Sequence, residues 1–228
     1  MSMKDLAAHV AEHGFVVATN WFSAGALAAM DVELEDRLAA RPVEAHDDGG
    51  FGRRFDVRVD VGAADGLEAV ASLFAADRVV ELTTAILQPG WRAEGPPLIF
   101  STPRDGQQGW HQDSSAQEPG QFMVNRIIYP RQVHAEQGGL VLVPGSHRQG
   151  DIPQGGNHEA IPGEITILPQ AGTLLIMHSR CWHRVQANRS DLPRTQVNWR
   201  ARPASAPEHL GNTPVFRTGR WDFARARG

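Results

Sequence analysis

Apolar side chains in the first forty residues recur at the spacing of amphipathic helices. Leu6 and Val10 share one face of a segment from Lys4 to His13, which Gly14 closes. A second helical segment begins after Ser23, a favourable N-cap, and stops before Pro42. Its apolar positions are Leu27, Met30, Leu34 and Leu38. Between the two helices, residues 14–18 read Gly-Phe-Val-Val-Ala and predict a short strand.

A third helical pattern covers roughly residues 64–87 and ends at Pro89-Gly90. The intervening residues 43–65 are rich in Gly, Asp and Arg and lack apolar periodicity. We expect a surface loop there.

From residue 96 onward the pattern changes to short β-rich runs separated by Gly and Pro turns. The predicted strands are Leu98–Thr102, Phe122–Tyr129, Leu140–Val143, Glu164–Leu168, Thr173–His178 and Thr195–Arg202. Helices first and strands afterwards, without βαβ alternation, favour an α+β fold in which helices pack against one antiparallel β-core, a sandwich or barrel.

Composition narrows the class of protein. The chain has 228 residues, 41% hydrophobic and 21% charged, which suits a compact globular domain. A formal net charge of -4 lacks the excess of positive charge that nucleic-acid-binding proteins use to bind phosphates, so we do not expect a nucleic-acid partner. One cysteine, no signal-peptide core and no long apolar run favour a cytoplasmic protein without a membrane partner. No residue pattern indicates an oligomeric state.

The sequence Trp110-His-Gln-Asp113 carries the first chemical signal. In an extended chain, side chains two positions apart point to the same side, so His111 and Asp113 can bind one ion. An isolated His-x-Asp is also common on protein surfaces without any metal.

A second cluster, His178-Ser-Arg-Cys-Trp-His183, follows an apolar strand and precedes Arg194. Two imidazoles and one carboxylate on one face of an octahedral ion are typical of non-haem Fe(II) oxygenases. A structural zinc site would require four protein ligands, often thiolates, and the chain has a single Cys. Spacing alone leaves both His178 and His183 open as the third ligand.

Taken together, these motifs resemble the phytanoyl-CoA dioxygenase family of Fe(II)- and 2-oxoglutarate-dependent oxygenases. The resemblance covers most of the chain and is carried by residues 13–17, 110–113, 138–147, 172–178, 182–183 and 194. It implies a double-stranded β-helix, the jelly roll of cupin-like proteins, with N-terminal helices packed on one side. We therefore expect one domain over residues 1–228, with a helical support (1–95), a β-core that holds the metal (96–205) and a C-terminal tail (206–228).

The resemblance also implies roles for individual residues. His111, Asp113 and His183 would ligate Fe(II), and Arg194, eleven positions after His183, would bind the far carboxylate of 2-oxoglutarate. A guanidinium suits that role on physical grounds, because its planar fork can hold a carboxylate bidentately. Asn125 lies where family members place a polar contact to the co-substrate.

The activity implied is oxidation of a small-molecule metabolite with O2, in which 2-oxoglutarate is converted to succinate and CO2. Asp113 predicts hydroxylation or desaturation rather than halogenation, because related halogenases replace that carboxylate with a small residue. Two alternatives remain on the same fold. One is a cupin-like metalloenzyme without redox chemistry, since the ligand types also accept Mn, Ni or Zn. The other is a catalytically silent protein that binds a small acid.

Overall fold

The computed structural model describes residues 1–40, 58–60, 66–117, 120, 122–207 and 214–220. Its helices are α1 (Met3–His13), α2 (Ala24–Ala39), α3 (Glu68–Ala75) and α4 (Asp77–Leu87). Its strands are β1 (Phe15–Ala18), β2 (Arg58–Asp60), β3 (Arg92–Ala93), β4 (Leu98–Thr102), β5 (Gln108–Gln112), β6 (Val124–Tyr129), β7 (Leu140–Leu142), β8 (Ile165–Ile167), β9 (Thr173–His178), β10 (His183–Val185), β11 (Arg194–Asn198), β12 (Ala201–Arg202), β13 (Val215–Phe216) and β14 (Gly219–Arg220).

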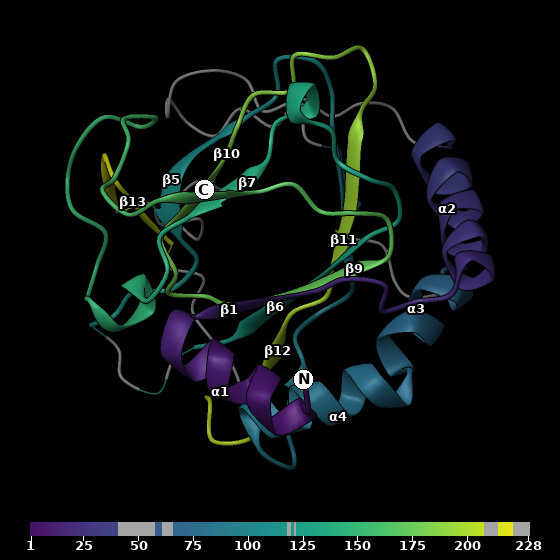
Figure 1. The fold of residues 1–228 in the computed structure, drawn as a ribbon, viewed down its shortest axis with the longest axis horizontal. Helices are drawn as coiled ribbons and strands as arrows, with labels where there is room; N and C mark the ends of the chain where they lie inside the picture. The colour runs from purple at the N-terminus through teal and green to yellow at the C-terminus, as the bar shows by residue number, and fades with distance from the viewer. Residues whose placement is uncertain (41–57, 61–65, 118–119, 121, 208–213, 221–228) are drawn as a thin grey trace, which may run out of the picture.

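The strands form two antiparallel sheets. The major sheet has the order β1-β9-β6-β11-β4-β2, with β12 and β3 attached beside β6. The minor sheet has the order β14-β13-β5-β10-β7-β8. Apolar side chains from β1, β6 and β9 meet side chains from β7 and β8 in one buried cluster, so the two sheets face each other. This is the predicted α+β architecture with the two sheets of a double-stranded β-helix (Figure 1).

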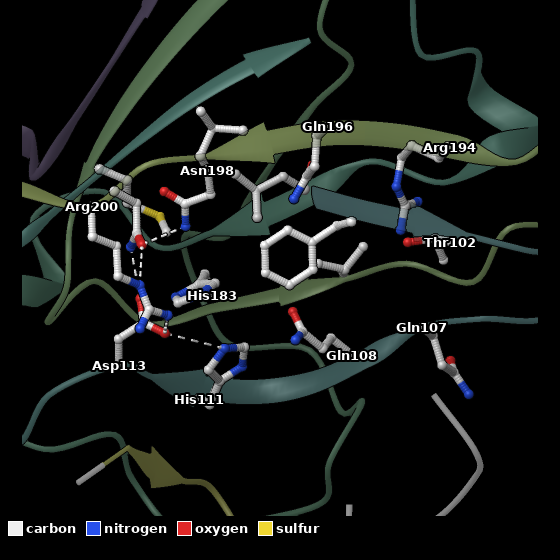
Figure 2. A pocket seen from close by; sticks show the side chains of 16 residues that line it. Thr102, Gln107, Gln108, His111, Asp113, His183, Arg194, Gln196, Asn198 and Arg200 are labelled. Atoms are coloured by element: carbon white, nitrogen blue, oxygen red, sulfur yellow. Dashed lines mark hydrogen bonds and ion pairs between the residues drawn. The ribbon is translucent and has the colours of Figure 1, made fainter. Parts of the chain in front are cut away.

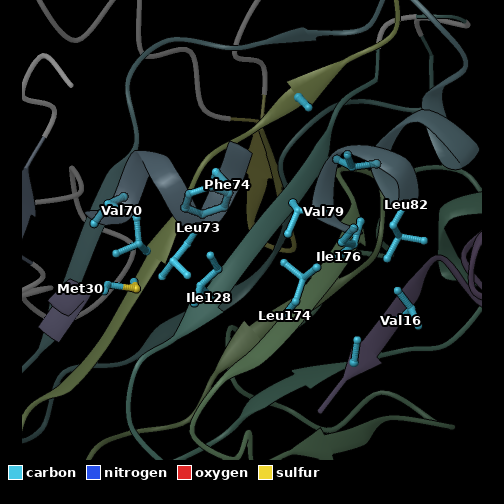
Figure 3. Packing of buried hydrophobic residues seen from close by; sticks show 14 of the residues in the cluster. Val16, Met30, Val70, Leu73, Phe74, Val79, Leu82, Ile128, Leu174 and Ile176 are labelled. Carbon is cyan, nitrogen blue, oxygen red and sulfur yellow. The ribbon is translucent and has the colours of Figure 1, made fainter. Parts of the chain in front are cut away.

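The helices cover the outer face of the major sheet (Figures 1 and 3). Ser23 is the N-cap of α2 as predicted, because its Oγ accepts from the Ala26 amide. Ser2 caps α1 in the same way by accepting from the Asp5 amide, which the sequence analysis did not predict. The helices bury their apolar faces against the sheet through residues that include Leu6, Val10, Met30, Leu34, Val70, Phe74, Val79 and Leu82.

Strands β6 and β9 are buried on both faces, because helices cover one side and the minor sheet covers the other. On β9, Leu174 and Ile176 pack toward the helices, whereas Leu175 and Met177 point between the sheets. On β6, Val124 and Ile128 face the helices, and Asn125 points the other way, into the space between the sheets. The same alternation sends His178 to the helix side.

The predicted helix over 64–87 is wrong in one respect: it is two helices. Ala76 separates α3 from α4 with an extended ψ of 135°. The buried residues explain the break, since Phe74 and Val79 are five positions apart. One continuous helix would turn those two side chains to different faces, because each residue advances the helix by about 100°.

Strands also occur in the two segments for which the sequence predicts no helix or strand, the loop at 43–65 and the tail at 206–228. Arg58–Asp60, inside the loop expected at 43–65, pairs with β4, and the rest of that loop lies outside the described residues. In the C-terminal segment, β13 pairs with β5 and brings Phe216 opposite His111. No helix in the described part of the chain is long and apolar enough to cross a membrane.

Candidate active site

His111, Asp113 and His183 converge between the two sheets. His111 lies near the end of β5, Asp113 follows that strand, and His183 begins β10. Because β10 pairs with β5, His183 lies directly opposite His111, and the two ring centroids are 4.1 Å apart. One potential ligand atom from each of the three side chains lies within 4.8 Å of the others. Among the described residues this is the one cluster of His, Cys, Asp and Glu with that geometry.

Backbone carbonyls orient both imidazoles. His111 Nδ1 lies 2.8 Å from the carbonyl oxygen of Gly109, and His183 Nδ1 lies 2.9 Å from that of Cys181. A carbonyl only accepts, so each Nδ1 carries the proton and each Nε2 keeps its lone pair. Such outer partners fix the tautomer and ring orientation of metal-binding histidines. The donor set therefore fits a divalent metal.

The charge states also suit a metal. Burial, reinforced by the neighbouring His183, lowers the pKa of His111 to about 4, so its imidazole is neutral at physiological pH. Burial pushes the pKa of Asp113 upward, but the positive charge of Arg200, electrostatic interactions with His183 and His111, and the hydrogen bond from Asn125 together outweigh this and hold the pKa at about 2. Asp113 is thus a carboxylate beside the neutral imidazole of His111.

Asn125 holds the Asp113 carboxylate in place. Its Nδ2 donates to Asp113 Oδ2 at 2.7 Å, while its own Oδ1 accepts from Asn198 Nδ2 at 2.8 Å and from Arg200 Nε at 3.1 Å. Asp113 Oδ1 is left 3.8 Å from His111 Nε2. The amide of Asn125 thereby selects which carboxylate oxygen faces the imidazoles.

Arg194 lies at the other end of the same cavity, beside Thr102 (Figure 2). Its Nη1 donates to the backbone carbonyls of Gln137, Gly138 and Gln186 at 2.5, 2.6 and 3.3 Å. The backbone at Gln137-Gly138 and at Gln186 thus fixes the position of the guanidinium. Arg194 is 4% exposed, burial lowers its pKa to about 10, and no carboxylate of the described residues pairs with it. A buried cation of this kind is costly without an anion, so it fits a carboxylate ligand.

His178 is remote from this cluster, as expected of a residue on the opposite face of β9. Its ring stacks on Phe122, with centroids 4.7 Å apart, and its Nδ1 accepts from the Arg180 amide at 3.1 Å. Trp110 and Trp182 pack in an apolar cluster on the far side of the minor sheet. They shape the sheet rather than the cavity.

The cavity contains residues that the motif analysis did not identify (Figure 2). Their polar members are Thr102, Gln107, Gln108, Gln196, Asn198 and Arg200. Strand alternation was the available signal for three of them, because residues 194, 196, 198 and 200 share the inward face. Asn198 and Arg200 both contact Asn125, so they belong to the network around Asp113.

Comparison with known proteins agrees with this geometry. Residues 10–196 match the family described as phytanoyl-CoA dioxygenase (PhyH). The solved structure of the epimerase SnoN, in complex with Fe3+, alpha-ketoglutarate and nogalamycin RO, is 21% identical, with a TM-score of 0.71 over 94% of this chain and 86% of SnoN.

Two further solved structures share the fold. The carbocyclase SnoK from nogalamycin biosynthesis is 18% identical, with a TM-score of 0.71 over 100% of this chain and 91% of SnoK. HygX from Streptomyces hygroscopicus, with nickel and 2-oxoglutarate bound, is 16% identical, with a TM-score of 0.70 over 87% of this chain and 86% of HygX.

Proposed function

Because the chain belongs to the phytanoyl-CoA dioxygenase family of Fe(II)- and 2-oxoglutarate-dependent oxygenases, we propose that it hydroxylates a C–H bond of a small molecule. In the balanced reaction, substrate C–H, 2-oxoglutarate and O2 become alcohol, succinate and CO2. One oxygen atom of O2 enters the alcohol and the other enters succinate. The observation that carries the proposal is the convergence of His111, Asp113 and His183 in one cavity with a buried Arg194 that forms no ion pair with any carboxylate of the described residues.

His111 Nε2, Asp113 Oδ1 and His183 Nε2 are the atoms that would hold Fe(II). Three protein ligands on one face would leave the other positions of an octahedral ion to the co-substrate and O2, with the substrate bound beside the metal. The bound metal supplies the redox chemistry, and the protein contributes ligand geometry and charge. The carboxylate of Asp113 would take the metal position that a halide needs, which supports hydroxylation over halogenation.

Arg194 would bind the far carboxylate of 2-oxoglutarate. Three backbone carbonyls accept hydrogen bonds from its Nη1 and fix the guanidinium in place. The side chain therefore loses little further conformational entropy when an anion binds. Thr102 lies directly opposite Arg194 in the pairing of β11 with β4 and offers a hydroxyl beside it. Asn125 borders the same cavity, and we assign it a contact to the co-substrate in addition to its hydrogen bond with Asp113.

The test is formation of succinate. Anaerobically purified protein is loaded with Fe(II) and 2-oxoglutarate and then exposed to O2, with and without a panel of metabolites. Slow succinate formation without substrate is expected to disappear in His111→Ala and to fall in Arg194→Gln. Binding of 2-oxoglutarate without any succinate would instead favour a silent binding protein, and turnover supported by Mn(II) or Zn(II) without O2 would favour a non-redox enzyme.

A further inference from the structure

Arg200 is a second arginine of the cavity, at the end opposite Arg194 (Figure 2). It follows Asn198 by two positions on the inward face, and its side chain is 21% exposed. Its Nε donates to Asn125 Oδ1 at 3.1 Å, and its Nη2 lies 3.4 Å from Asp113 Oδ1. Arg200 therefore places a positive charge beside the oxygen that faces the two imidazoles.

The ion pair of Arg200 with Asp113 is incomplete. It is a single long contact rather than the bidentate arrangement that an arginine and a carboxylate can form. The other partner, Asn125, is neutral, and Nη1 of Arg200 has no hydrogen bond to any residue in the described part of the chain. If a metal ion takes Asp113 Oδ1, the compensation for the Arg200 charge falls further.

The net charge of the cavity with metal and 2-oxoglutarate bound indicates the charge of the substrate. Among the residues that line the cavity, Asp113 is the one acidic residue. Arg194 and Arg200 are the two side chains there that always carry a positive charge. With a divalent metal and dianionic 2-oxoglutarate bound, positive charge would exceed negative charge by about one elementary charge, because an imidazole that gives its Nδ1 proton to a backbone carbonyl and its Nε2 lone pair to a metal carries no net charge. An unneutralised charge in a buried site is costly. A single negative charge on the substrate would balance it.

The remaining lining argues for the same class of ligand. It is neutral and polar at Gln107, Gln108 and Gln196, and it is apolar at Phe100, Ile127, Leu140, Met177 and Val185. A cationic substrate would meet no acidic partner among these residues apart from Asp113, which the metal would occupy. A compact molecule with one anionic group matches both the excess charge and the lining.

We propose that the primary substrate carries a carboxylate and that Arg200 binds it next to the metal, on the opposite side from the Arg194 subsite. This inference rests on the proposed function. Arg200 is a substrate-binding residue in this scheme, and its contact with Asn125 positions the guanidinium while Nη1 is left to the ligand. The competing source of a carboxylate is the keto-acid end of 2-oxoglutarate itself.

The experiment has two arms, both under anaerobic conditions with Ni(II) in place of Fe(II). The first measures the dissociation constant of 2-oxoglutarate for wild type, Arg194→Gln and Arg200→Gln. We expect Arg194→Gln to raise it by about 100-fold, the loss of a buried charge-assisted pair, and Arg200→Gln to change it by no more than about twofold.

The second arm uses protein saturated with Ni(II) and 2-oxoglutarate. Acetate, propionate, benzoate and phenylacetate are titrated against their primary amides, with isothermal titration and the thermal midpoint as readouts. At least one acid is expected to bind wild type about tenfold or more tightly than its amide. Arg200→Gln should lose that preference and Arg200→Lys, which keeps the charge, should retain part of it.

Each result decides one of the proposals. If wild type does not bind 2-oxoglutarate, the proposed function and this inference both fall. If wild type binds 2-oxoglutarate but no acid is preferred over its amide, or the preference survives in Arg200→Gln, the inference alone is overturned. The inference is also overturned if Arg200→Gln raises the dissociation constant of 2-oxoglutarate as much as Arg194→Gln does, because Arg200 would then bind the co-substrate. A purely structural Arg200 would alter the affinity for Ni(II) and leave the ratio of acid to amide unchanged.

Discussion

The amide of Asn125 donates a hydrogen bond of 2.7 Å to Asp113 Oδ2 and so turns Asp113 Oδ1 toward His111 Nε2, 3.8 Å away. Asn125 is 1% exposed and is itself held by Asn198 and Arg200. Because the network is buried and reciprocal, the carboxylate has little freedom to rotate. The orientation of the Asp113 carboxylate is thus determined by β6, on the sheet opposite the two histidines.

Replacing Asn125 tests this orientation. Asn125→Ala removes the donor to Asp113 and is expected to weaken binding of Mn(II) by about 10- to 100-fold, the usual effect of losing a partner behind a metal ligand. Gln196→Ala is the control, since Gln196 lines the cavity without a hydrogen bond to the three-residue cluster. Isothermal titration with both variants checks the prediction, and equal metal affinity for wild type and Asn125→Ala would contradict it.

Sequence spacing leaves both His178 and His183 as candidates for the third metal ligand, and one variant of each distinguishes them. His183→Ala removes one of three converging donors and is expected to weaken Fe(II) binding by about 100-fold or more under anaerobic conditions. His178→Asn, on the opposite face of β9, should keep wild-type affinity. A loss of metal in His178→Asn with retention in His183→Ala would reverse the assignment.

Gly14 is predicted to be intolerant of any side chain. Its φ of +83° is left-handed, and a Cβ there would lie 2.3 Å from Cys181 Sγ and 2.5 Å from His147 Nδ1. Gly14→Ala should therefore lower the free energy of unfolding by about 2–4 kcal/mol, from backbone strain and overpacking together.

Gly25 provides the control for Gly14. It lies in the first turn of α2, and a Cβ there would meet nothing within 4 Å. Gly25→Ala should be neutral or raise the free energy of unfolding by up to about 1 kcal/mol. Urea denaturation of both variants measures the difference, and equal effects of the two substitutions would refute the argument.

His178 predicts a dependence of stability on pH. Burial, with smaller contributions from His147 and Arg180, lowers its pKa from 6.5 to about 3. Between those values the unfolded chain binds a proton at this site that the folded chain does not. The free energy of unfolding should therefore fall as the pH decreases below 6.5, by at most about 1.4 kcal/mol per pH unit, and this contribution is constant above pH 6.5.

His178→Asn removes this titration while keeping an acceptor for the Arg180 amide. Denaturation at pH 7.5 and 5.0 should show that wild type loses up to about 2 kcal/mol more than the variant over this interval. Parallel losses in the two proteins would show that His178 does not titrate in this way. The other buried histidines contribute equally to both and cancel in the comparison.

The β-core was predictable because its signals are local. Residues 98–102 and 173–178 were predicted as strands and form β4 and β9 with those bounds. The shared face of His111 and Asp113 follows from alternation along one strand. The double-stranded β-helix was implied by the resemblance and is confirmed by the two antiparallel sheets.

What could not be predicted depends on pairings between distant segments. The hydrogen bond from Asn125 to Asp113 joins β6 to the end of β5 across the interior, and no sequence spacing encodes that distance. Arg200 could have been found from its place in the alternation after Arg194, but its role beside Asp113 requires the packing of the two sheets. The break at Ala76 has a local signal, because Phe74 and Val79 are five positions apart and a single helix would not bury both on one face.

The edge strand β1 has a consequence for synthesis of the protein. Phe15 pairs with Met177, so β1 is synthesised about 160 residues before the strand that it pairs with. Until then α1 has emerged with an apolar stripe and no sheet to cover it. The domain therefore cannot close before β9 has been translated, and holding chaperones are expected to engage α1 and β1 until then.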